Sequence, residues 1–401
     1  MLSFFSGSSN AVNSETAMRE CLDLAFGEGG GADADLLVLH ATMGHNFPQL
    51  LAAAKEACPK ARIIGCSGSG VIGHEGVSEN MRALAIMAVT GDEIAVATMD
   101  GLTGGNSAEV AAEAAAKLKA ERGDIQFIYI LTAGLNLSGD RVIDGIESVF
   151  GKEIALFGAT AADNGKAKRS FQIADDKVVE DGVLLVGFAD PTLELITGVH
   201  HGSVPLDGMT MEVTKVHDNE IIEFDGNPAW PTLMGKLGLG AEAEPGETLP
   251  IAGVGEQLSD EDQAAYDNSH VLRVPIGVSD DHQSFYLPIA PAEGTKLTLV
   301  QRDEDHIFSG LDRLMGRIEG QLGERRPEAV FHADCMARGR LTFDRVLKDE
   351  IIAKMQHPIC RGEKVPWLGV YGFSEYCQIA DTNWFHSYTT ALYMLVRKEA
   401  A

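Results

Sequence analysis

The segment from Ala329 to Phe343, AVFHADCMARGRLTF, places His, Asp, Cys and Arg side chains directly behind a short apolar run. Cys335 has a histidine three residues before it and Arg338 three residues after it. A guanidinium close to a thiol lowers the thiol pKa, which a cysteine nucleophile or redox sensor needs. An arginine followed by Gly339 at a strand end also suits a bidentate grip on a carboxylate. The segment is therefore a candidate catalytic site and a candidate ligand pocket.

Structural roles explain the same residues without any ligand. A cysteine directly after a strand is often a small core residue. Arg338 could equally form an ion pair with Asp334 or Asp344. The segment alone leaves these interpretations open.

A second candidate nucleophile is Ser67, in the run Gly-Cys-Ser-Gly-Ser. This run misses the G-x-S-x-G nucleophile elbow by one residue, because Ser69 stands where the last glycine is needed. The overlapping run from Gly68 to Gly73 fits G-x-G-x-x-G, but no helical pattern follows it, and a dinucleotide fingerprint requires a helix there. A glycine-rich turn explains the run better than a nucleotide site.

The run from Asp381 to Thr389, DTNWFHSYT, interleaves aromatic residues with one imidazole. Trp384 and His386 could line a ligand pocket, or a haem pocket with His386 as axial ligand. An amphipathic core strand gives the same pattern. The pair His200 and His201 has no carboxylates at metal-ligand spacing, so we expect no metal site.

Composition excludes several classes of partner. The 401-residue chain has 32 Lys and Arg against 59 Asp and Glu, a formal net charge of −27. Such a chain repels nucleic-acid backbones and anionic lipid surfaces. The first residues show no signal-peptide pattern and no apolar run has the length of a membrane span, so we expect a cytoplasmic protein without membrane insertion. The 6 cysteines form no C-x-x-C pair, which argues against structural zinc, c-type haem and a disulfide framework.

Three strand–helix–strand segments of the chain resemble one another. They run from LLVLHATMGHN to RIIGCSGSGVI, from FIYILTAGLNLSG to ALFGATAADNG, and from AVFHADCMARG to GVYGFSEYCQI. Each opens with an apolar run typical of a buried parallel strand. We align the ends of the return strands as Gly65–Ser67, Gly158–Thr160 and Gly372–Ser374, and we expect an insertion around residues 356–366 of the longer third segment. Any βαβ unit has this general form, but the shared Gly-x-Ser or Gly-x-Thr ending favours internal repetition.

The pattern predicts an α/β (mixed α+β) fold with βαβ repeats and mixed sheets. Beyond Arg169 the sequence pattern changes to that of strands in an antiparallel sheet. The stretch around Pro205 is a candidate boundary between an N-terminal domain (residues 1–205) and a C-terminal domain (residues 206–401). In parallel units, ligands bind beyond the carboxyl ends of the strands, so the polar strand ends could share one crevice. The candidate ligand-binding residues are His40, Ser67, Thr132, Thr160, Asp163, Asp334, Cys335, Arg338, Gly339, Tyr371, Ser374, Glu375, Trp384 and His386.

The order and spacing of several motifs resemble the FIST domain proteins, bacterial sensory modules with an N-terminal and a C-terminal FIST region. IIGCSGSGVI resembles the Gly-Cys-Ser segment of the family, and ALFGATAADNGKAKRSFQI with VLLVGF resembles its glycine-rich turn and following strands. DGNPAWPTLMGKLG resembles the helix that opens the second region, AVFHADCMARG carries the Cys-x-x-Arg, and VYGFSEYCQI with WFHSYT resembles the closing motif. Gly70-Val71-Ile72 and Cys377-Gln378-Ile379 stand where the family often has Gly-Glu-Ile, so we expect a different ligand preference.

The resemblance implies a sensory protein that binds a small ligand, with amino acids proposed for the family and haem-based nitric oxide sensing known in some relatives. No kinase, cyclase or receptor domain is fused to the chain, so we expect a separate signalling partner. On this basis Arg338 would hold a ligand carboxylate, Asp163 an ammonium group, and Tyr371 or Trp384 an apolar part. Ser67, Thr160 and Ser374 would add hydroxyl contacts. The alternatives are a haem-binding nitric oxide sensor and a hydrolase that uses Cys335 or Ser67.

Overall fold

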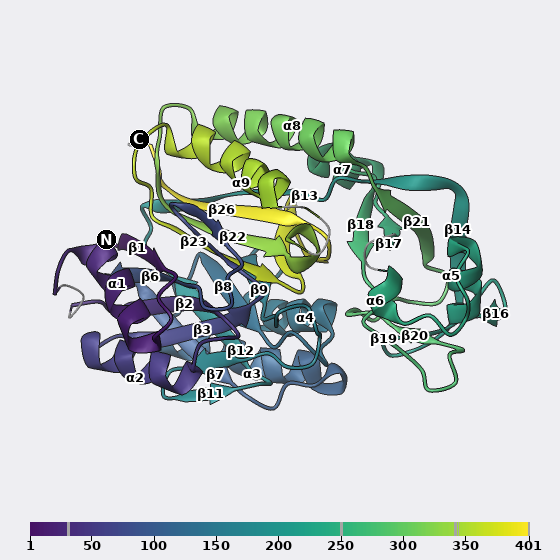
Figure 1. Ribbon diagram of the computed structural model, residues 1–401, viewed down its shortest axis with the longest axis horizontal. Coiled ribbons are helices and arrows are strands. Elements are labelled where there is room, and N and C mark those ends of the chain that lie inside the picture. Colours follow the sequence, from purple (N-terminus) through teal and green to yellow (C-terminus); the bar gives the residue numbers. More distant parts are fainter. Residues whose placement is uncertain (30–32, 249–251, 341–342, 344, 400–401) are drawn as a thin grey trace.

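Three consecutive stretches of the chain build the same series of elements, and a further domain is inserted into the third. Figure 1 shows the inserted domain beside the body that the three repeats form. The computed structural model describes residues 1–29, 33–248, 252–340, 343 and 345–399. We name the parts repeat unit 1 (3–90), repeat unit 2 (94–188), repeat unit 3 (193–200 with 304–397) and the inserted domain (203–302).

Each repeat unit has a first strand, a helix, a parallel strand–helix–strand segment, a short hairpin and a closing strand. Unit 1 comprises β1 (Ser3–Ser9), α1 (Ser14–Phe26), β2 (Leu36–Thr42), α2 (Phe47–Ala57), β3 (Arg62–Gly68), β4 (Val71–Gly73), β5 (Gly76–Ser78) and β6 (Leu84–Thr90). Unit 2 comprises β7 (Ile94–Met99), η1 (Gly104–Asn106), α3 (Ser107–Glu121), β8 (Phe127–Thr132), α4 (Gly139–Phe150), β9 (Ala155–Thr160), β10 (Gln172–Ala174), β11 (Lys177–Val179) and β12 (Val183–Phe188). Unit 3 comprises β13 (Leu193–His200), α8 (Glu304–Leu322), β22 (Pro327–Cys335), η2 (Met336–Arg338), α9 (Arg345–Cys360), β23 (Trp367–Gly372), β24 (Glu375–Ile379), β25 (Thr382–His386) and β26 (Thr390–Arg397).

The three six-stranded sheets of the repeats have the same strand order. In each, a parallel pair lies at the centre, the closing and first strands of the unit extend it on one side, and a hairpin extends it on the other: β1-β6-β2-β3-β10-β11, β7-β12-β8-β9-β24-β25 and β13-β26-β22-β23-β4-β5. The parallel pairs are buried along their length, which explains the continuous apolar runs. The predicted α/β class with βαβ repeats and mixed sheets is confirmed.

The hairpins are exchanged between units in a closed cycle. Hairpin β4–β5 follows β3 in the chain but pairs with β23 of unit 3. Hairpin β10–β11 of unit 2 pairs with β3 of unit 1, and hairpin β24–β25 of unit 3 pairs with β9 of unit 2. No repeat unit therefore completes its own sheet within the described chain.

The register of these pairs corrects the sequence alignment of the third repeat. Gly65 and Gly158 each lie between the neighbouring parallel strand and the incoming hairpin. In unit 3 this position belongs to Gly369, which pairs with His332 and Ile72. The equivalent of Gly65–Ser67 is thus 369–371, three residues before the expected position. The sequence alignment relied on a Gly-x-Ser motif, and in the third repeat that motif occurs again at 372–374, at the end of the strand.

The extra length of the third repeat also lies elsewhere than expected. Helix α9 has 16 residues, against 11 in α2 and 12 in α4. The short helix η2 and the stretch up to residue 344 add more length before α9 begins. The expected insertion at residues 356–366 is therefore wrong, since that region holds the end of α9 and an ordinary connection.

The inner faces of the three sheets meet in one central core, and helices cover the outer faces. Tyr129 of strand β8 contacts Phe331 of β22 with ring centroids 4.8 Å apart, and Phe4 of β1 contacts Phe188 of β12 with ring centroids 6.3 Å apart. Helices α1 and α2 cover the first sheet, α3 and α4 the second, and α8 and α9 the third. The last pair lies across the upper part of Figure 1.

Local sequence explains where these helices begin and end. Before α1, the Asn13 side chain accepts a hydrogen bond from the Thr16 amide, and the helix ends at Gly27, whose φ is +88°. Ala17 and Cys21 lie four residues apart on its buried face. Among the described helices none has the length and hydropathy to cross a bilayer.

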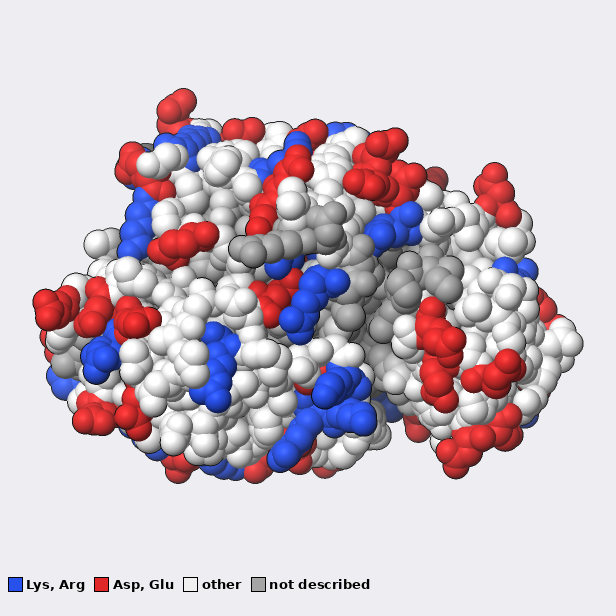
Figure 2. All heavy atoms as spheres, in the orientation of Figure 1, with Lys and Arg blue, Asp and Glu red and all other residues white. Residues whose placement is uncertain are grey.

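The inserted domain leaves and rejoins repeat unit 3 at adjacent points, because Ser203 at its start pairs with Arg302 at its end. Its sheet is antiparallel, and Figure 2 shows acidic side chains gathered on its visible face. The predicted division between residues 205 and 206 falls inside β14 and stays a prediction. The elements are β14 (Ser203–His217), β15 (Glu220–Phe224), β16 (Asn227–Pro228), α5 (Ala229–Leu237), α6 (Pro245–Thr248), β17 (Gly253–Gln257), α7 (Asp260–Tyr266), β18 (His270–Arg273), β19 (Gly277–Val278), β20 (Phe285–Tyr286) and β21 (Lys296–Arg302).

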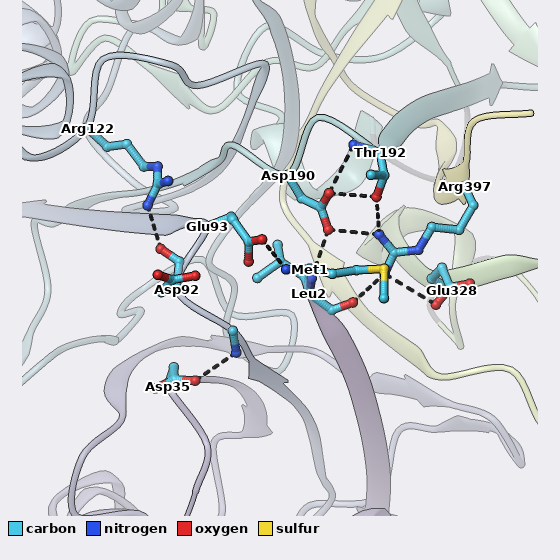
Figure 3. Close-up of polar contacts among 11 residues, drawn as sticks. Met1, Leu2, Asp35, Asp92, Glu93, Arg122, Asp190, Thr192, Glu328 and Arg397 are labelled. Atoms are coloured by element: carbon cyan, nitrogen blue, oxygen red, sulfur yellow. Dashed lines mark hydrogen bonds and ion pairs between the residues drawn. The ribbon is translucent and has the colours of Figure 1, made fainter. Parts of the chain in front are cut away.

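A polar cluster around Asp190 joins the chain segments that begin and end the repeats (Figure 3). The Asp190 carboxylate accepts hydrogen bonds from the Leu2 amide at 2.8 Å, from Thr192 Oγ1 at 2.6 Å and from Arg397 Nη1 at 2.8 Å. Arg397 also donates to the Leu2 carbonyl. Burial alone would raise the pKa of Asp190, but these hydrogen bonds outweigh it and lower the pKa below its ordinary value.

Candidate functional site

The carboxyl end of β22 carries a buried ion pair. Arg338 folds back from η2 and donates from Nε to Asp334 Oδ1 at 2.9 Å and from Nη1 to the His201 carbonyl at 2.9 Å. The residues are 4% and 1% exposed, so neither charge is solvated by water. Asp334 Oδ2 lies 3.6 Å from His332 Nε2, beyond a normal hydrogen bond. The expected pairing partner Asp344 lies outside the described residues.

A second carboxyl group lies next to this pair. Glu375 begins β24, is fully buried, and accepts a hydrogen bond from Thr389 Oγ1 through Oε2 at 2.5 Å. Burial, together with the negative charge of Asp334, raises the pKa of Glu375 well above its ordinary value. The Cys335 amide donates to the Thr389 carbonyl at 2.9 Å, which ties the strand end to the same loop.

The inserted domain supplies another wall. Tyr266, the last residue of α7, is 2% exposed, and its ring lies 5.5 Å from the His201 ring and 5.7 Å from the His386 ring. Burial raises the pKa of Tyr266, and the neighbouring acidic groups of Cys377 and Glu375 raise it further. Burial lowers the pKa of His386 to about 3, so this imidazole is neutral near pH 7.

These groups share one property: buried polar atoms that have no hydrogen-bond partner among the described residues, here named open atoms. Native proteins contain few such atoms, because each costs about 1–3 kcal/mol. Six of the fourteen open atoms in the described chain belong to this one place. We name it the buried polar cluster, and its open atoms are Tyr266 Oη, Asp334 Oδ2, Arg338 Nη2, Glu375 Oε1, His386 Nδ1 and Ser387 Oγ.

The cluster presents both kinds of hydrogen-bonding group to one region. Arg338 Nη2 is a charged donor, whereas Asp334 Oδ2 is a charged acceptor. Glu375 carries a proton when its raised pKa exceeds the pH, so it can donate or accept. A small molecule with an anionic group and an N–H group would satisfy both sides.

Comparison with known families identifies the chain. The FIST N domain matches residues 35–227 and the FIST C domain matches residues 235–378. The chain belongs to the FIST family. FIST domains are sensory, small-ligand-binding domains of signal-transduction proteins. The buried polar cluster draws on both matched regions, because Arg338 of the second bonds to the His201 carbonyl of the first.

Solved structures add little to this assignment. A cyanuric acid hydrolase from A. caulinodans aligns over 100% of both chains at 8% identity with a TM-score of 0.39. PurL of T. maritima, complexed with AMPPCP, aligns over 99% of this chain and 72% of that chain at 10% identity with a TM-score of 0.23. Likenesses this weak support no conclusion about the FIST chain. No curated protein matches it.

Cys335 does not have the environment of an activated thiol. Its Sγ donates to the Phe373 carbonyl at 3.6 Å, and the residue is 3% exposed. Burial and the nearby Glu375 raise the pKa of the thiol well above its ordinary value. The expectation that Arg338 lowers the pKa of the Cys335 thiol is therefore wrong, because Asp334 already neutralises the guanidinium.

Several predicted ligand contacts of the FIST chain hold the exchanged hairpins in place instead. Ser67 Oγ donates to the Ala162 carbonyl at 2.7 Å and accepts from the Phe171 amide at 2.8 Å. The Ser374 amide donates to Thr160 Oγ1 at 3.0 Å. Thr132 Oγ1 lies 3.1 Å from the Tyr376 hydroxyl. These hydroxyl groups have structural partners and lie outside the candidate site, which also argues against Ser67 as a nucleophile.

His40 and Asp163 are likewise structural. His40 lies in the central core, where its ring bonds Tyr129 Oη at 3.0 Å and Cys66 Sγ at 3.3 Å, and burial lowers its pKa to about 3. The Asp163 carboxylate accepts from four consecutive backbone amides, those of residues 166–169. A carboxylate used in this way does not receive a ligand ammonium group.

Gly339 and Tyr371 lie beside the buried polar cluster. Tyr371 is 1% exposed and has Asp334, Glu79 and Arg338 as charged neighbours. A Cβ on Gly339 would come within 2.4 Å of Glu79 Oε1, so the glycine makes room for a carboxylate from unit 1. Glu79 in turn pairs with Lys348 at 2.7 Å.

The surroundings of His386 bear on haem binding, and the arrangement of His, Cys, Asp and Glu side chains bears on metal binding. His386 Nε2 lies 3.1 Å from the Cys377 carbonyl and the ring is fully buried beside Tyr266, so this imidazole does not fit axial haem ligation. Within the described part of the chain, no His, Cys, Asp and Glu side chains group as metal ligands. Trp384 lies two residues before His386 on β25 and lines a cavity between the inserted domain and the body of repeat units.

Sequence reasoning missed Tyr266, Thr389 and Ser387. Tyr266 gives no signal, because it lies on the inserted domain far from the strand ends in sequence. Ser387 lies within the WFHSYT motif that carried the family resemblance, so that motif could have pointed to it.

Proposed function

We propose that this FIST protein is an intracellular sensor that binds an amino acid, or a closely similar small carboxylate, at the buried polar cluster. The observation that carries the proposal is the concentration of open atoms from Asp334, Arg338 and Glu375. A ligand carboxylate would take the Arg338 Nη2 donor. A ligand ammonium group would donate to Asp334 Oδ2 and Glu375 Oε1.

The position of Arg338 links such a ligand to the inserted domain. The His201 carbonyl that accepts from Arg338 lies two residues before Ser203, where the inserted domain begins. A ligand that draws the guanidinium towards itself would weaken that hydrogen bond. Binding would thus shift the inserted domain, and a separate signalling protein would read this shift. A change of this kind requires that the ligand bind the two positions with different affinity.

A thermal-shift screen tests the proposal. The panel contains the amino acids, short carboxylates and hemin. A ligand that binds only the folded state stabilises it by about 2.7 kcal/mol at a hundred times its Kd. We expect a saturable rise in Tm with at least one amino acid or carboxylate. A rise with hemin alone, together with a Soret band, would favour a haem sensor instead.

Arg338→Met makes the test specific to the site. Methionine keeps the apolar stem but removes the guanidinium, so we expect the ligand-dependent rise in Tm to disappear. The matched control is Arg169→Met, because Arg169 pairs with Glu180 on the surface, where ion pairs contribute about 0–1 kcal/mol. An undiminished rise in the Arg338 variant would rule out the assignment. Glu375→Gln, which keeps shape and burial, serves if the first variant does not fold.

A further inference from the structure

A cavity of about 460 Å³ lies between the inserted domain and the body of repeat units. Helix α4 and the strand β25 with its preceding turn form one side, and parts of the inserted domain form the other. Acidic residues outnumber basic ones in its lining, with Lys152 and Arg273 as the cations. The acidic lining residues are Asp140, Asp144, Glu147, Glu256 and Asp381.

The inner wall of this cavity reaches the buried polar cluster. Phe385 of β25 lines the cavity, and the next residue along the strand is His386 of the cluster. His386 is also the cross-strand partner of Glu375. Directly paired residues in an antiparallel sheet have Cβ atoms about 4.5–5.5 Å apart. One strand, β25, therefore separates the cavity from the cluster, and it is the edge strand of its sheet.

Arg273 of the inserted domain lies against β25, on the side that faces the cavity. It lines the cavity, is 3% exposed, and donates from Nη1 to the Phe385 carbonyl at the free edge of β25. Its Nη2 donates to Glu256 Oε2 at 2.9 Å. It is also a charged neighbour of both Tyr266 and His386.

Two features indicate that the Arg273 side chain can move away from β25. The Arg273 Nε atom is open, with no hydrogen-bond partner in the described ranges, so the guanidinium is held less fully than its burial demands. Its ion-pair partner Glu256 is 30% exposed, so solvent reaches one side of the pair. Rotation of one long side chain would uncover the edge of β25 without moving a sheet.

We propose that the cavity is the entrance to the buried polar cluster and that Arg273 is its gate. The inference rests on the proposed function for the identity of the molecule that passes, but not for the opening itself. The excess of carboxylates at the entrance attracts molecules that carry a positive group and slows anions. The gate therefore adds charge selection before any contact with Arg338.

Cysteine modification tests the gate without a ligand. Cys335 and Cys377 lie at the cluster. In repeat unit 1, Cys21 lies on the buried face of α1, and Cys58 is the buried residue that directly follows α2. The native full-length chain is treated with a cationic and an anionic methanethiosulfonate, and the modification rate of each cysteine is followed by mass spectrometry. In Arg273→Met we expect faster modification at Cys335 or Cys377, by roughly tenfold or more. The rates at Cys21 and Cys58 should not change.

The charge of the reagent provides the second readout. In the open variant the cationic reagent should react several times faster than the anionic one at the cluster cysteines. Arg169→Met, the surface-arginine control, should retain wild-type rates. Unchanged rates at both cluster cysteines would overturn the proposal. If all four of these cysteines react equally faster in Arg273→Met, the substitution has loosened the whole fold, and Glu256→Gln is the deciding variant. It frees Arg273 from its ion pair and leaves the core intact. Unchanged modification rates of Cys335 and Cys377 in Glu256→Gln would overturn the proposal.

Discussion

At the residue scale, burial governs the chemistry of the candidate site. Cys335 and Glu375 lie in the same cluster, and the pKa of each is raised because their charged forms lose the solvation of water. A raised pKa removes the thiolate that a cysteine nucleophile needs. The same kind of shift lets Glu375 keep its proton to a higher pH than an exposed glutamate would.

Glu375→Gln should change the pH dependence of stability. An unfolded glutamate titrates near a pKa of about 4.3. A carboxyl group whose folded pKa is raised contributes stability below the unfolded pKa, and this contribution is lost as the pH rises through the folded pKa. We expect the Tm of the wild type to fall relative to that of Glu375→Gln as the pH rises above about 5. A Tm difference that stays constant across the pH series would contradict the raised pKa.

The sequence located part of this site for a physical reason. Arg338, Asp334 and Cys335 lie within a few residues of one strand end, so local spacing alone brings them together. Tyr266 and Arg273 come from the inserted domain, and only the folded chain places them beside β24 and β25. Ser67 has the right type and lies at a strand end, but the incoming hairpin takes up its hydroxyl.

At the element scale, close contacts fix the exchanged hairpin β24–β25. Gly139 begins α4, and a Cβ there would lie 2.3 Å from the ring of Phe385. The Asn383 side chain of the same hairpin donates to Glu147 Oε1 at 2.8 Å and accepts from the Leu156 amide at 3.0 Å. The hairpin thus docks on α4 through both packing and hydrogen bonds.

Gly139→Ala should weaken this docking. The added methyl group must displace the Phe385 ring, and overpacking of this kind costs about 1–3 kcal/mol. Gly316→Ala is the matched control, because nothing lies within 4 Å of its Cβ position on α8. Alanine at an exposed helical position stabilises by about 0.5–1 kcal/mol relative to glycine. Chemical denaturation of both variants measures the difference, and equal free energies of unfolding would refute the close contact.

The elements themselves were largely predictable, but their assembly was not. Apolar runs such as 36–40 and 127–131 identify buried strands by composition alone. A hairpin has the same local pattern whichever sheet accepts it, so the exchange left no trace in the sequence. The offset in the third repeat has the same origin, because Gly372-Phe373-Ser374 resembles the motif without occupying its register.

At the scale of the whole molecule, the Asp190 cluster connects β1, β13 and β26 (Figure 3). Arg397 lies at the opposite end of β26 from Thr390, which pairs with Asp334 of the site. Its carboxylate accepts from three chain segments that are distant in sequence. Loss of this one side chain therefore affects contacts between segments of units 1 and 3 together.

Asp190→Asn should destabilise the protein near neutral pH and much less in acid. A carboxyl group with a lowered folded pKa contributes stability above its unfolded pKa, and the contribution is lost as the pH falls through the folded pKa. We expect a loss of about 1–3 kcal/mol at pH near 7. The difference from wild type should shrink below a pH of about 4. Urea denaturation at two pH values measures it, and a larger difference in acid would contradict the assigned pKa direction.

The cyclic exchange of hairpins has a consequence for how the chain is made. Hairpin β4–β5 leaves the ribosome about 300 residues before its partner β23, and synthesis at roughly 5–20 residues per second makes that delay roughly 15–60 s. Throughout this interval the nascent chain exposes an unmatched hairpin and, in unit 1, an unfinished sheet edge. Prematurely terminated products cannot close the ring at all. We therefore expect the yield of this chain to depend on chaperone capacity during translation more than on the stability of the finished fold.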